Sequence, residues 1–359
     1  MTPTRTTTAW LNAIGTAVPE HDIHHAFIDW ARERIRDPRQ ARVFDRMAAR
    51  SGIAHRWSAL PPTREGGSPV APGGFYASDP MPGTADRMAL YASFAPVLAL
   101  SAIAALTKRV PLGEVTHLIV ASCTGFVAPG IDQRIAQRLG LKPSVERLLI
   151  GFMGCYAAVA ALRSARHIVR SQPDARVLVV TVELSTLHLQ PDREIEPLLA
   201  MLQFGDGAAA AIVSADPLGF AIDAPFATTL PDSGDLIRWD ITDRGFAMHL
   251  SGEVPARIAA GLADPDFAHA ATGGHDVAMI DGWAVHAGGR SILDAVEAAL
   301  HLPGDALDAS RGVLADHGNM SSATLMFVLA RLLGRPVERG VALAFGPGLA
   351  AEGFGFHSA

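Results

Sequence analysis

Cys155, His286 and Asn319 are three side chains whose types together can carry out acyl transfer. A thiolate attacks a thioester carbonyl, an imidazole can pair with that thiolate, and imidazole and carboxamide N–H groups can hold a developing oxyanion. A neutral carboxamide also suits a carbanion, because it donates a hydrogen bond to an enolate without quenching it as an acid would. Each residue alone has a structural explanation: a small buried hydrophobe, a hydrogen-bonded core histidine and a helix cap. Only the three together indicate catalysis.

The stretch around Cys155 predicts a glycine turn that leads into a buried helix. A short strand is expected over 145–150, Gly151-Phe152-Met153-Gly154 follows it, and charge returns only at Arg163. The positive end of a helix favours a thiolate, so we expect the pKa of the Cys155 thiol to fall. The uncharged run from Leu148 to Leu162 is shorter than the roughly 20 residues that span a bilayer, which indicates a buried core without stable membrane insertion.

His286 and Asn319 are each predicted at the edge of a regular element. His286 ends a strand over 277–286 and precedes Gly288-Gly289 and a helix over 291–300, while Asn319 opens a helix over 319–333. A strand end before a glycine turn is a position where loops form active sites. The remaining histidines, including His117, His188, His269 and His275, show no metal-ligand spacing, so no metal site is expected.

The elements that must position these residues alternate along the chain. Further strands are expected over 10–18, 117–121, 175–184, 205–213, 341–345 and 349–357, and further helices over 24–51, 84–107 and 131–139. Thr84 is expected to cap the second of these helices and Pro96 to kink or break it. Residues 61–83 are dense in Pro and Gly and predict a surface loop. Strands and helices that alternate twice over indicate an α/β fold with buried sheets.

Composition limits the classes of protein and partner. The chain has 359 residues, 49% of them hydrophobic and 18% charged, and a net charge of −6, which argues against nucleic acid as a main partner. Two cysteines and an N-terminus (residues 1–8) without the apolar core of a signal peptide fit a reducing cytoplasm. Arg42, Arg46 and Arg50 share one helix face, which is either a solvated surface or a binding site for the phosphates of coenzyme A.

At these residues the chain resembles the type III polyketide synthases, the chalcone synthase-like branch of the thiolase superfamily, and in particular its bacterial members. The matching stretches keep the family's order from about residue 115 to the C-terminus: Gly154-Cys155, Phe204-Gly205-Asp206-Gly207-Ala208-Ala209-Ala210, Val285-His286-Ala287-Gly288-Gly289, Gly318-Asn319-Met320-Ser321-Ser322 and Phe345-Gly346-Pro347-Gly348. The first 110 residues match more weakly, through Arg46, Arg50 and Arg56-Trp57. The resemblance implies a five-layered αβαβα fold of two similar halves, with Cys155 in residues 1–220 and His286 and Asn319 in residues 221–359.

The resemblance also implies an iterative acyltransferase. Cys155 would carry the growing chain, while His286 and Asn319 would support decarboxylation of malonyl-CoA and stabilise oxyanions. Substrate contacts would come from Cys123, Thr124, Ala128, Ser185, Phe204 (a gatekeeper), Met248, Gly346 and Pro347, and coenzyme A contacts from Arg46, Arg50, Gly288 and Gly289. Acyl-CoA and malonyl-CoA would be substrates, with no cofactor. The family forms homodimers, so a cytoplasmic homodimer is expected, with an interface over 124–133.

Several positions depart from the plant members of this family. Ala287 replaces a Pro and Ala344 a Gly, Met248 stands at the second gatekeeper position, and Cys123 matches the tetrahydroxynaphthalene and phloroglucinol synthases. Plant-like flavonoid specificity is therefore not expected.

Side-chain volume gives an expectation for the starter unit. Thr124, Ala128 and Ser185 are small at cavity-floor positions, and mycobacterial alkylpyrone synthases share the Ala where plant enzymes carry Met. This predicts a medium- or long-chain acyl-CoA starter, extended by malonyl-CoA to an alkylpyrone or alkylresorcinol, although the bulky His188 could block the opening. The alternatives are a ketoacyl-ACP synthase III-like single condensation, a malonyl-CoA-only synthase, and a thiolase-fold binding protein without catalysis.

Overall fold

One mixed sheet of nine strands forms the frame of the protein. The structure is a computed structural model, and it describes residues 7–359. The strand order is β11-β12-β13-β8-β1-β7-β6-β4-β5. The strands of the first half are β1 (Trp10–Ala17), β4 (His117–Ser122), β5 (Glu146–Gly151), β6 (Val177–Leu184) and β7 (Asp206–Ser214), and those of the second are β8 (Phe220–Thr229), β11 (Gly282–Val285), β12 (Gly340–Gly346) and β13 (Ala350–Ser358).

The two halves of the sheet repeat one topology. In the first half β4 is parallel to β6, β6 is antiparallel to β7, and β7 is antiparallel to β1. The second half has the same pattern, with β11 parallel to β12, β12 antiparallel to β13, and β13 antiparallel to β8. The halves join where Trp10 and Leu11 of β1 pair with Ala221 and Phe220 of β8. The duplication expected from the order of elements alone is therefore present in the strand pairing.

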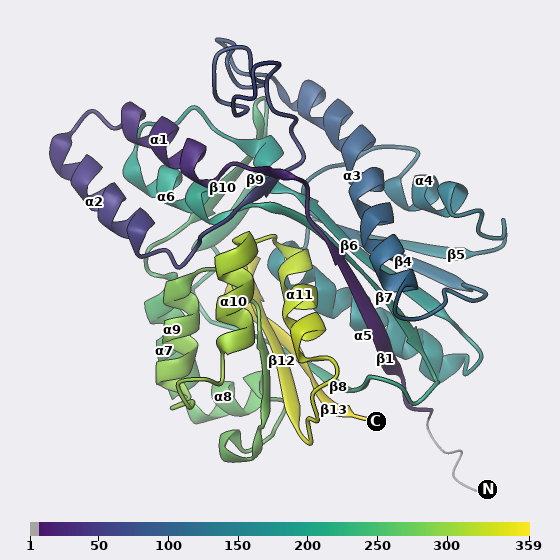
Figure 1. The fold of residues 1–359 in the computed structure, drawn as a ribbon. Helices are drawn as coiled ribbons and strands as arrows, with labels where there is room; N and C mark the ends of the chain where they lie inside the picture. Colours follow the sequence, from purple (N-terminus) through teal and green to yellow (C-terminus); the bar gives the residue numbers. More distant parts are fainter. Residues whose placement is uncertain (1–6) are drawn as a thin grey trace, which may run out of the picture.

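Helices complete a five-layered arrangement (Figure 1). The central layer consists of α5 (Ala157–Ser171) and α11 (Ser322–Leu332), which pack against strands of both halves. The outer layer of the first half comprises α1 (His24–Arg34), α2 (Pro38–Ala49), α3 (Thr84–Thr107), α4 (Ile131–Arg138) and α6 (Ile195–Gln203), and that of the second half comprises α7 (Val254–Ala263), α8 (Pro265–Ala271), α9 (Arg290–Ala299) and α10 (Asp308–His317). The predicted αβαβα fold is confirmed.

Three apolar clusters hold these layers together. One surrounds α5 and α11 and includes strand residues of both halves, one lies under α1 to α4 and α6, and one lies under α7 to α9. All eight residues of β6 and all seven of β12 are buried. This agrees with their continuous apolar sequence, which is typical of strands covered on both faces.

Short elements complete the chain. Two short antiparallel strand pairs lie outside the main sheet: β2 (His21–Asp22) with β3 (Trp57–Ser58), and β9 (Ile237–Thr242) with β10 (Gly245–Leu250). Single 3-10 turns are η1 (Gly154–Tyr156), η2 (Ser185–His188), η3 (Val277–Met279) and η4 (Pro347–Leu349). Residues 61–83 contain no helix or strand, as predicted, and the loop lies beside the first turn of α3.

Four predictions about where elements begin, end or break were wrong. The helix expected over 24–51 is two helices, because Pro38 cannot donate to a preceding turn and instead begins α2, where Asp37 caps Arg39 N–H at 2.8 Å. α3 runs unbroken through Pro96, and Gly83 rather than Thr84 is its N-cap residue. The strand expected over 277–286 is the turn η3 followed by the shorter β11.

α3 is the one helix in residues 7–359 that is long and apolar enough to cross a membrane. It packs against β1, β6 and β7 of the sheet, and Ala95, Ala99 and Ala102 on its inner face have no exposed surface. These contacts are those of a helix in the outer layer of a globular fold.

Candidate active site

Cys155 lies in η1, the turn between β5 and the central helix α5, and its side chain is half-buried. Gly154 has φ 73, and a Cβ there would lie 2.4 Å from Cδ of Pro347, so only glycine fits. A Cβ on Gly346 would lie 3.4 Å from the Cys155 nitrogen. The segment after β12 therefore packs directly on the Cys155 turn, which brings Gly346 and Pro347 to the nucleophile.

The pKa of the Cys155 thiol is raised to about 12, because burial disfavours the thiolate. The charge of Glu183 raises the pKa further, while hydrogen bonding by the side chains of Ser321 and Asn319 lowers it. The expectation that the helix N-terminus would lower this pKa was wrong. Loss of water around the sulfur outweighs the partial charge at the start of α5.

Hydrogen bonds hold both the backbone and the side chain of Asn319 in place. Its N–H donates to Gln203 O at 2.8 Å, and its carbonyl accepts from Gly205 N at 3.0 Å. Its Oδ1 accepts from Ser321 N at 2.8 Å, and its Nδ2 donates to Gly288 O at 3.1 Å. Since an amide nitrogen carries two hydrogens, Asn319 has a second donor, which can serve the Cys155 sulfur or, once that sulfur is acylated, a ligand.

His286 follows the last residue of β11, and its N–H donates to Leu343 O at 2.8 Å. The ring is buried, and neither ring nitrogen has a hydrogen-bond partner among residues 7–359. Burial lowers the pKa of the imidazole to about 3, so the ring is neutral near pH 7. A Cβ on Gly288 would lie 3.5 Å from Nε2, so a larger residue at 288 would pack directly against that nitrogen.

Asn319 joins the three chemical groups. Its amide bonds to the Gly288 carbonyl beside the His286 ring, and its side chain reaches the thiol of Cys155. The site thus combines a thiol, a neutral imidazole whose two nitrogens have no partner within residues 7–359, and a carboxamide with a second donor next to the thiol. Such a set can form a thioester and hold the negative charge of an enolate or tetrahedral oxyanion.

Cys123 and Thr124 belong to a buried network behind this site. Glu183 accepts hydrogen bonds from Cys123 N at 2.9 Å, Thr124 Oγ1 at 3.0 Å and Ser322 Oγ. The Cys123 sulfur accepts from Gly154 N at 2.9 Å. Burial raises the pKa of Glu183 to about 7, although these hydrogen bonds oppose the shift. Cys123 therefore braces the Cys155 turn through Gly154, and Thr124 is held in the same network through Glu183.

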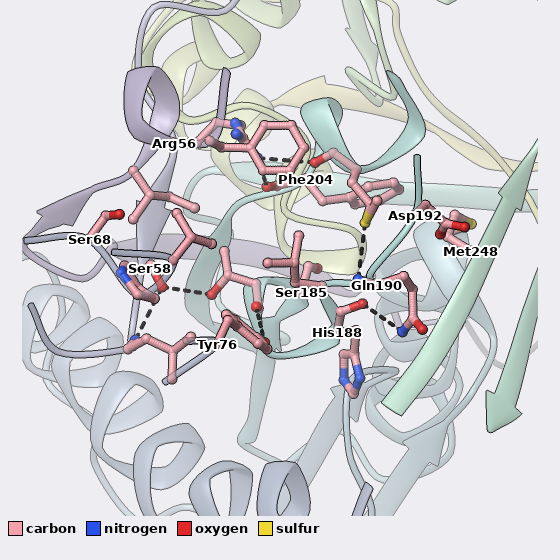
Figure 2. Close-up of a pocket in the computed structure, with 18 of the residues that line it drawn as sticks. Arg56, Ser58, Ser68, Tyr76, Ser185, His188, Gln190, Asp192, Phe204 and Met248 are labelled. Carbon is pink, nitrogen blue, oxygen red and sulfur yellow. Dashed lines mark hydrogen bonds between the residues drawn. The ribbon is translucent and has the colours of Figure 1, made fainter. Parts of the chain in front are cut away.

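A cavity of 240 Å³, here called the back cavity, lies behind Phe204 (Figure 2). Three residues expected to bind substrate line it, namely Ser185, Phe204 and Met248. The other lining residues are mostly apolar and come from α1, residues 57–76, η2 and the segment after it, α6, and the β9–β10 pair. Phe204 lines this cavity, and its backbone is bridged to Asn319.

A second cavity of 840 Å³, here called the front cavity, lies on the other side of α6. Arg50, Gly288, Gly289 and Arg290 line it together. Nη1 of Arg290 donates to the Arg50 carbonyl at 3.3 Å. Arg46 is exposed on α2 and does not line this cavity, so only part of the expected coenzyme A set meets there.

The structure does not bring Ala128 to the back cavity. Ala128 lines a separate surface hollow of 340 Å³ with Phe126 and Leu149. The expectation that Thr124 and Ala128 form an open cavity floor is therefore not met within this chain.

An aromatic wall closes that direction. Nε2 of His188 bonds to Thr124 O at 2.8 Å, and its Nδ1 accepts from Phe246 N at 3.0 Å. The rings of His188 and Phe246 stack at 4.2 Å, and Trp239 Nε1 donates to Cys123 O at 2.9 Å. His188 and Trp239 both line the back cavity, so they stand between it and the 123–124 backbone. The blocking role considered for His188 matches this geometry.

Three residues of the site were assigned no role from the sequence. Ser321 approaches the thiol, Glu183 ties the network behind it, and Trp239 builds the wall. Glu183 had a signal, because it is the one charge in the otherwise apolar strand 177–184. No pattern in the sequence marks Trp239. Among residues 7–359 no three His, Cys, Asp or Glu side chains are grouped to hold a metal ion.

Comparison with known proteins supplies independent findings. The family model of the N-terminal domain of chalcone and stilbene synthases matches residues 2–217, and that of the C-terminal domain matches residues 222–359. The chain is 32% identical to the "alpha-pyrone synthesis polyketide synthase-like Pks18" of Mycobacterium tuberculosis, over 98% of this chain and 91% of the relative. It is 38% identical to the bisdemethoxycurcumin synthase of Oryza sativa, over 69% of this chain and 67% of that protein.

Solved structures agree in fold. A polyketide synthase, PKS-I, of the brown alga Ectocarpus siliculosus superposes with a TM-score of 0.89 at 27% identity, over 99% of this chain and 100% of the other. The C-terminal type III polyketide synthase domain of Steely1 from Dictyostelium superposes with a TM-score of 0.84 at 26% identity, over 98% and 99% of the two chains.

Proposed function

Because the chain belongs to the chalcone and stilbene synthase family and is a type III polyketide synthase, an acyltransferase, we propose that it condenses malonyl-CoA repeatedly onto an acyl starter held on Cys155. The observation that carries this proposal is the meeting of Cys155, Asn319 and the His286 loop at one centre. The single condensation of a ketoacyl-ACP synthase and a non-catalytic binding role have no comparable support.

Loading begins with attack of the Cys155 sulfur on the carbonyl carbon of an acyl-CoA. The new carbon–sulfur bond forms as the thiol proton passes to the neutral His286 ring, and the carbonyl oxygen becomes an oxyanion. The oxyanion collapses, the bond to the coenzyme A sulfur breaks, and that sulfur leaves with the proton from His286. A thiol with a pKa near 12 needs such a base at the moment of attack, because little thiolate exists at neutral pH.

Extension requires the loss of carbon dioxide from malonyl-CoA. The carbon–carbon bond to the carboxylate breaks, and its electron pair forms a thioester enolate whose oxygen accepts hydrogen bonds from Asn319 and His286. Both donors are neutral, so they stabilise the enolate without protonating its carbon. The enolate carbon then attacks the thioester carbonyl on Cys155, which forms the new carbon–carbon bond and an oxyanion. The oxyanion collapses, the bond between the acyl carbon and the Cys155 sulfur breaks, and the sulfur takes up a proton from water by way of His286. The lengthened chain leaves on coenzyme A and can return to the thiol for another cycle.

The front cavity is the proposed entrance for coenzyme A. Gly288 and Gly289 precede α9, whose first N–H groups favour an anion, and Arg50 and Arg290 add positive charge beside them. The glycines also leave room for an extended chain to pass toward His286.

The proposed starter is a medium- or long-chain acyl-CoA, and the proposed product is an alkylpyrone or alkylresorcinol. The apolar lining of the back cavity next to Phe204 supports an apolar starter. The similarity to Pks18, which is described as α-pyrone synthesis polyketide synthase-like, supports an α-pyrone product. The small residues at 124 and 128 lend no support, since they lie away from that cavity.

We also propose a cytoplasmic homodimer and a division of the chain at residues 220 and 221. Phe126, Leu148 and Leu149 are large apolar side chains that are 42–45% exposed around the Ala128 hollow, which suits a covered surface near the 124–133 segment. Measurement of the mass in solution by light scattering tests the dimer. A monomer at micromolar concentration would contradict it.

The test of function is incubation of the protein with malonyl-CoA and a panel of acyl-CoA starters, with products identified by mass. We expect acylated Cys155 and pyrone- or resorcinol-type products that contain the starter, and no product from Cys155→Ala. Product from malonyl-CoA alone, with no starter incorporated, would identify a malonyl-CoA-only synthase. A single condensation product with carrier-protein substrates would overturn the iterative mechanism.

A further inference from the structure

The back cavity has an apolar lining whose polar groups are mostly engaged. Ile23, Ala26, Phe27, Leu60, Val70 and Leu189 supply apolar surface. Among the polar residues that line it, Tyr76 O–H donates to Thr186 O at 2.7 Å, and Gln190 Nε2 donates to His188 O at 2.9 Å (Figure 2). Gln190 Nε2 also donates to Arg244 O at 3.0 Å. A guest in this cavity thus gains mainly from burial of its own apolar surface.

Hydrogen bonds hold two sides of the cavity in place, and a loop forms a third side. Nη1 of Arg56 donates to the carbonyls of Met201 at 3.1 Å and Phe204 at 2.8 Å, which holds the end of α6. The His188–Trp239 wall closes the side toward Thr124. The remaining side is covered by residues 68–70, which lie in the loop 61–83 without helix or strand. The cavity therefore runs from Phe204 toward α1 and this loop, away from Ala128.

We propose that the back cavity binds the distal part of the starter acyl chain, and that Ala26 on α1 and Val70 in the loop set the length it accepts. This inference rests on the proposed function. A chain attached to Cys155 enters the cavity past Phe204 and Met248, which both line it. Phe204 connects the cavity to the catalytic centre, because its backbone is bridged to that of Asn319. The loop 61–83, which the sequence left without a role, covers the far end of the chain.

The volume of the cavity gives the proposal a chain length. A methylene group is about the size of a water molecule, which occupies about 30 Å³. A cavity of 240 Å³ therefore holds a segment of about eight methylenes. Each methylene moved from water into an apolar site contributes about 0.8 kcal/mol, which is about fourfold in kcat/KM. We expect kcat/KM to rise by about this factor per methylene and to level off once the cavity is filled.

The experiment compares starters of increasing length on variants that fill the cavity. Ala26→Trp adds bulk from a helix, and Val70→Trp adds it from a loop with no regular structure to disrupt. Glu33→Trp places the same side chain on the exposed face of α1, and Ala128→Phe fills the other hollow. Acetyl-, hexanoyl-, octanoyl- and palmitoyl-CoA are assayed with each, alongside acylation of Cys155 and release of carbon dioxide from malonyl-CoA.

We expect Ala26→Trp and Val70→Trp to remove at least about tenfold of the advantage of octanoyl- over acetyl-CoA, while acetyl-CoA use stays within about twofold. The Glu33→Trp and Ala128→Phe variants should keep the native ratio. An unchanged ratio in both cavity variants, or its loss in Ala128→Phe alone, would overturn the proposal. Failure of the native enzyme to load Cys155 or release carbon dioxide would instead refute the proposed function.

A chemical probe tests the location directly. An octanoyl chain with a terminal diazirine, loaded on Cys155 and photolysed, should label residues 23–27 or 68–70, and label in 124–133 would contradict the assignment. Nη2 of Arg56, at the cavity wall, has no hydrogen-bond partner among residues 7–359. An ω-carboxylated octanoyl-CoA preferred over octanoyl-CoA would therefore show that the cavity selects an anion and would overturn the apolar assignment.

Discussion

The N-termini of α5 and α11 occupy equivalent places in the two halves of the fold and carry different chemistry. Each helix leads into the inner strand of a parallel pair, β6 (paired with β4) after α5 and β12 (paired with β11) after α11. Each begins after residues with positive φ, Gly154 at 73° before α5, and Gly318 at 66° and Ser321 at 48° before α11. One terminus presents the thiol of Cys155 and the other the carboxamide of Asn319. Duplication has thus placed a nucleophile and a hydrogen-bond donor at one centre.

The strands beside these helices differ in a second way. At the end of β4, Cys123 and Thr124 are tied to the Glu183 carboxylate. At the equivalent end of β11, His286 has two ring nitrogens without a hydrogen-bond partner in the part of the chain that the structure describes. A group whose hydrogen bonds are satisfied inside the protein is unavailable to substrate, whereas an uncommitted buried group is costly unless substrate uses it. The first half therefore rigidifies the site and the second half leaves it reactive.

The largest expected effect is the loss of the nucleophile on the α5 side. Cys155→Ala should form no acyl-enzyme, because no other thiol is placed to attack, and the intact mass of the protein after incubation with octanoyl-CoA measures this. The control is Cys123→Ala, which removes the other thiol of the chain. Acylation lost in Cys123→Ala and retained in Cys155→Ala would reverse the assignment of the two cysteines.

On the α11 side, Asn319→Ala should separate the two steps. The variant should still acylate Cys155 but lose malonyl-CoA decarboxylation by on the order of a hundredfold or more, because the enolate loses one donor. Carbon dioxide release under single-turnover conditions measures the step. Asn12→Ala is the matched control, since Asn12 is similarly buried and its bonds lie at the far end of β1. Normal decarboxylation by Asn319→Ala would remove this residue from the mechanism.

The hydrogen-bond network around Glu183 predicts that the stability of the protein falls as pH rises. Burial raises the pKa of Glu183 to about 7, so the native state holds a proton that the unfolded state releases near pH 4.5. This stability is fully present below about pH 4.5 and is lost as pH rises through about 7. The free energy of unfolding should therefore fall by about 3 kcal/mol over this interval relative to Glu183→Gln, measured by urea titration. Parallel curves for the two proteins would refute it.

The smallest effect concerns the reactivity of the thiol in the resting enzyme. With a pKa of about 12, the thiolate fraction of Cys155 grows about tenfold per pH unit between about pH 7 and about pH 10. The rate of alkylation by iodoacetamide should follow that slope without a plateau, measured on Cys123→Ser so that only one thiol reports. A plateau below about pH 8 would mean that His286 and Cys155 form an ion pair at rest.

Much of the arrangement follows from the sequence because its causes are local. Continuous apolar runs predict the buried strands β6 and β7, and glycines before small apolar residues predict the turn and helix at Cys155. Motifs of fixed order relate Cys155, His286 and Asn319 to one chemistry, since each motif combines a reactive side chain with the backbone that displays it. Local rules failed at Pro38, which begins a helix where one was expected to continue, and at Pro96, which lies inside the unbroken α3. They also failed before β11, where the turn η3 replaces the start of the expected strand.

The tertiary structure alone decided which groups are free and which are tied. The sequence predicted a low pKa for Cys155 from one helix end, but the pKa depends on all the surfaces that exclude water from the sulfur, including residues 321 and 346–347. The sequence likewise placed Ala128 on the cavity floor, whereas His188, Trp239 and Phe246 meet from separate segments to close that side. Burial and cavity shape are sums over residues distant in the chain, so no local pattern contains them.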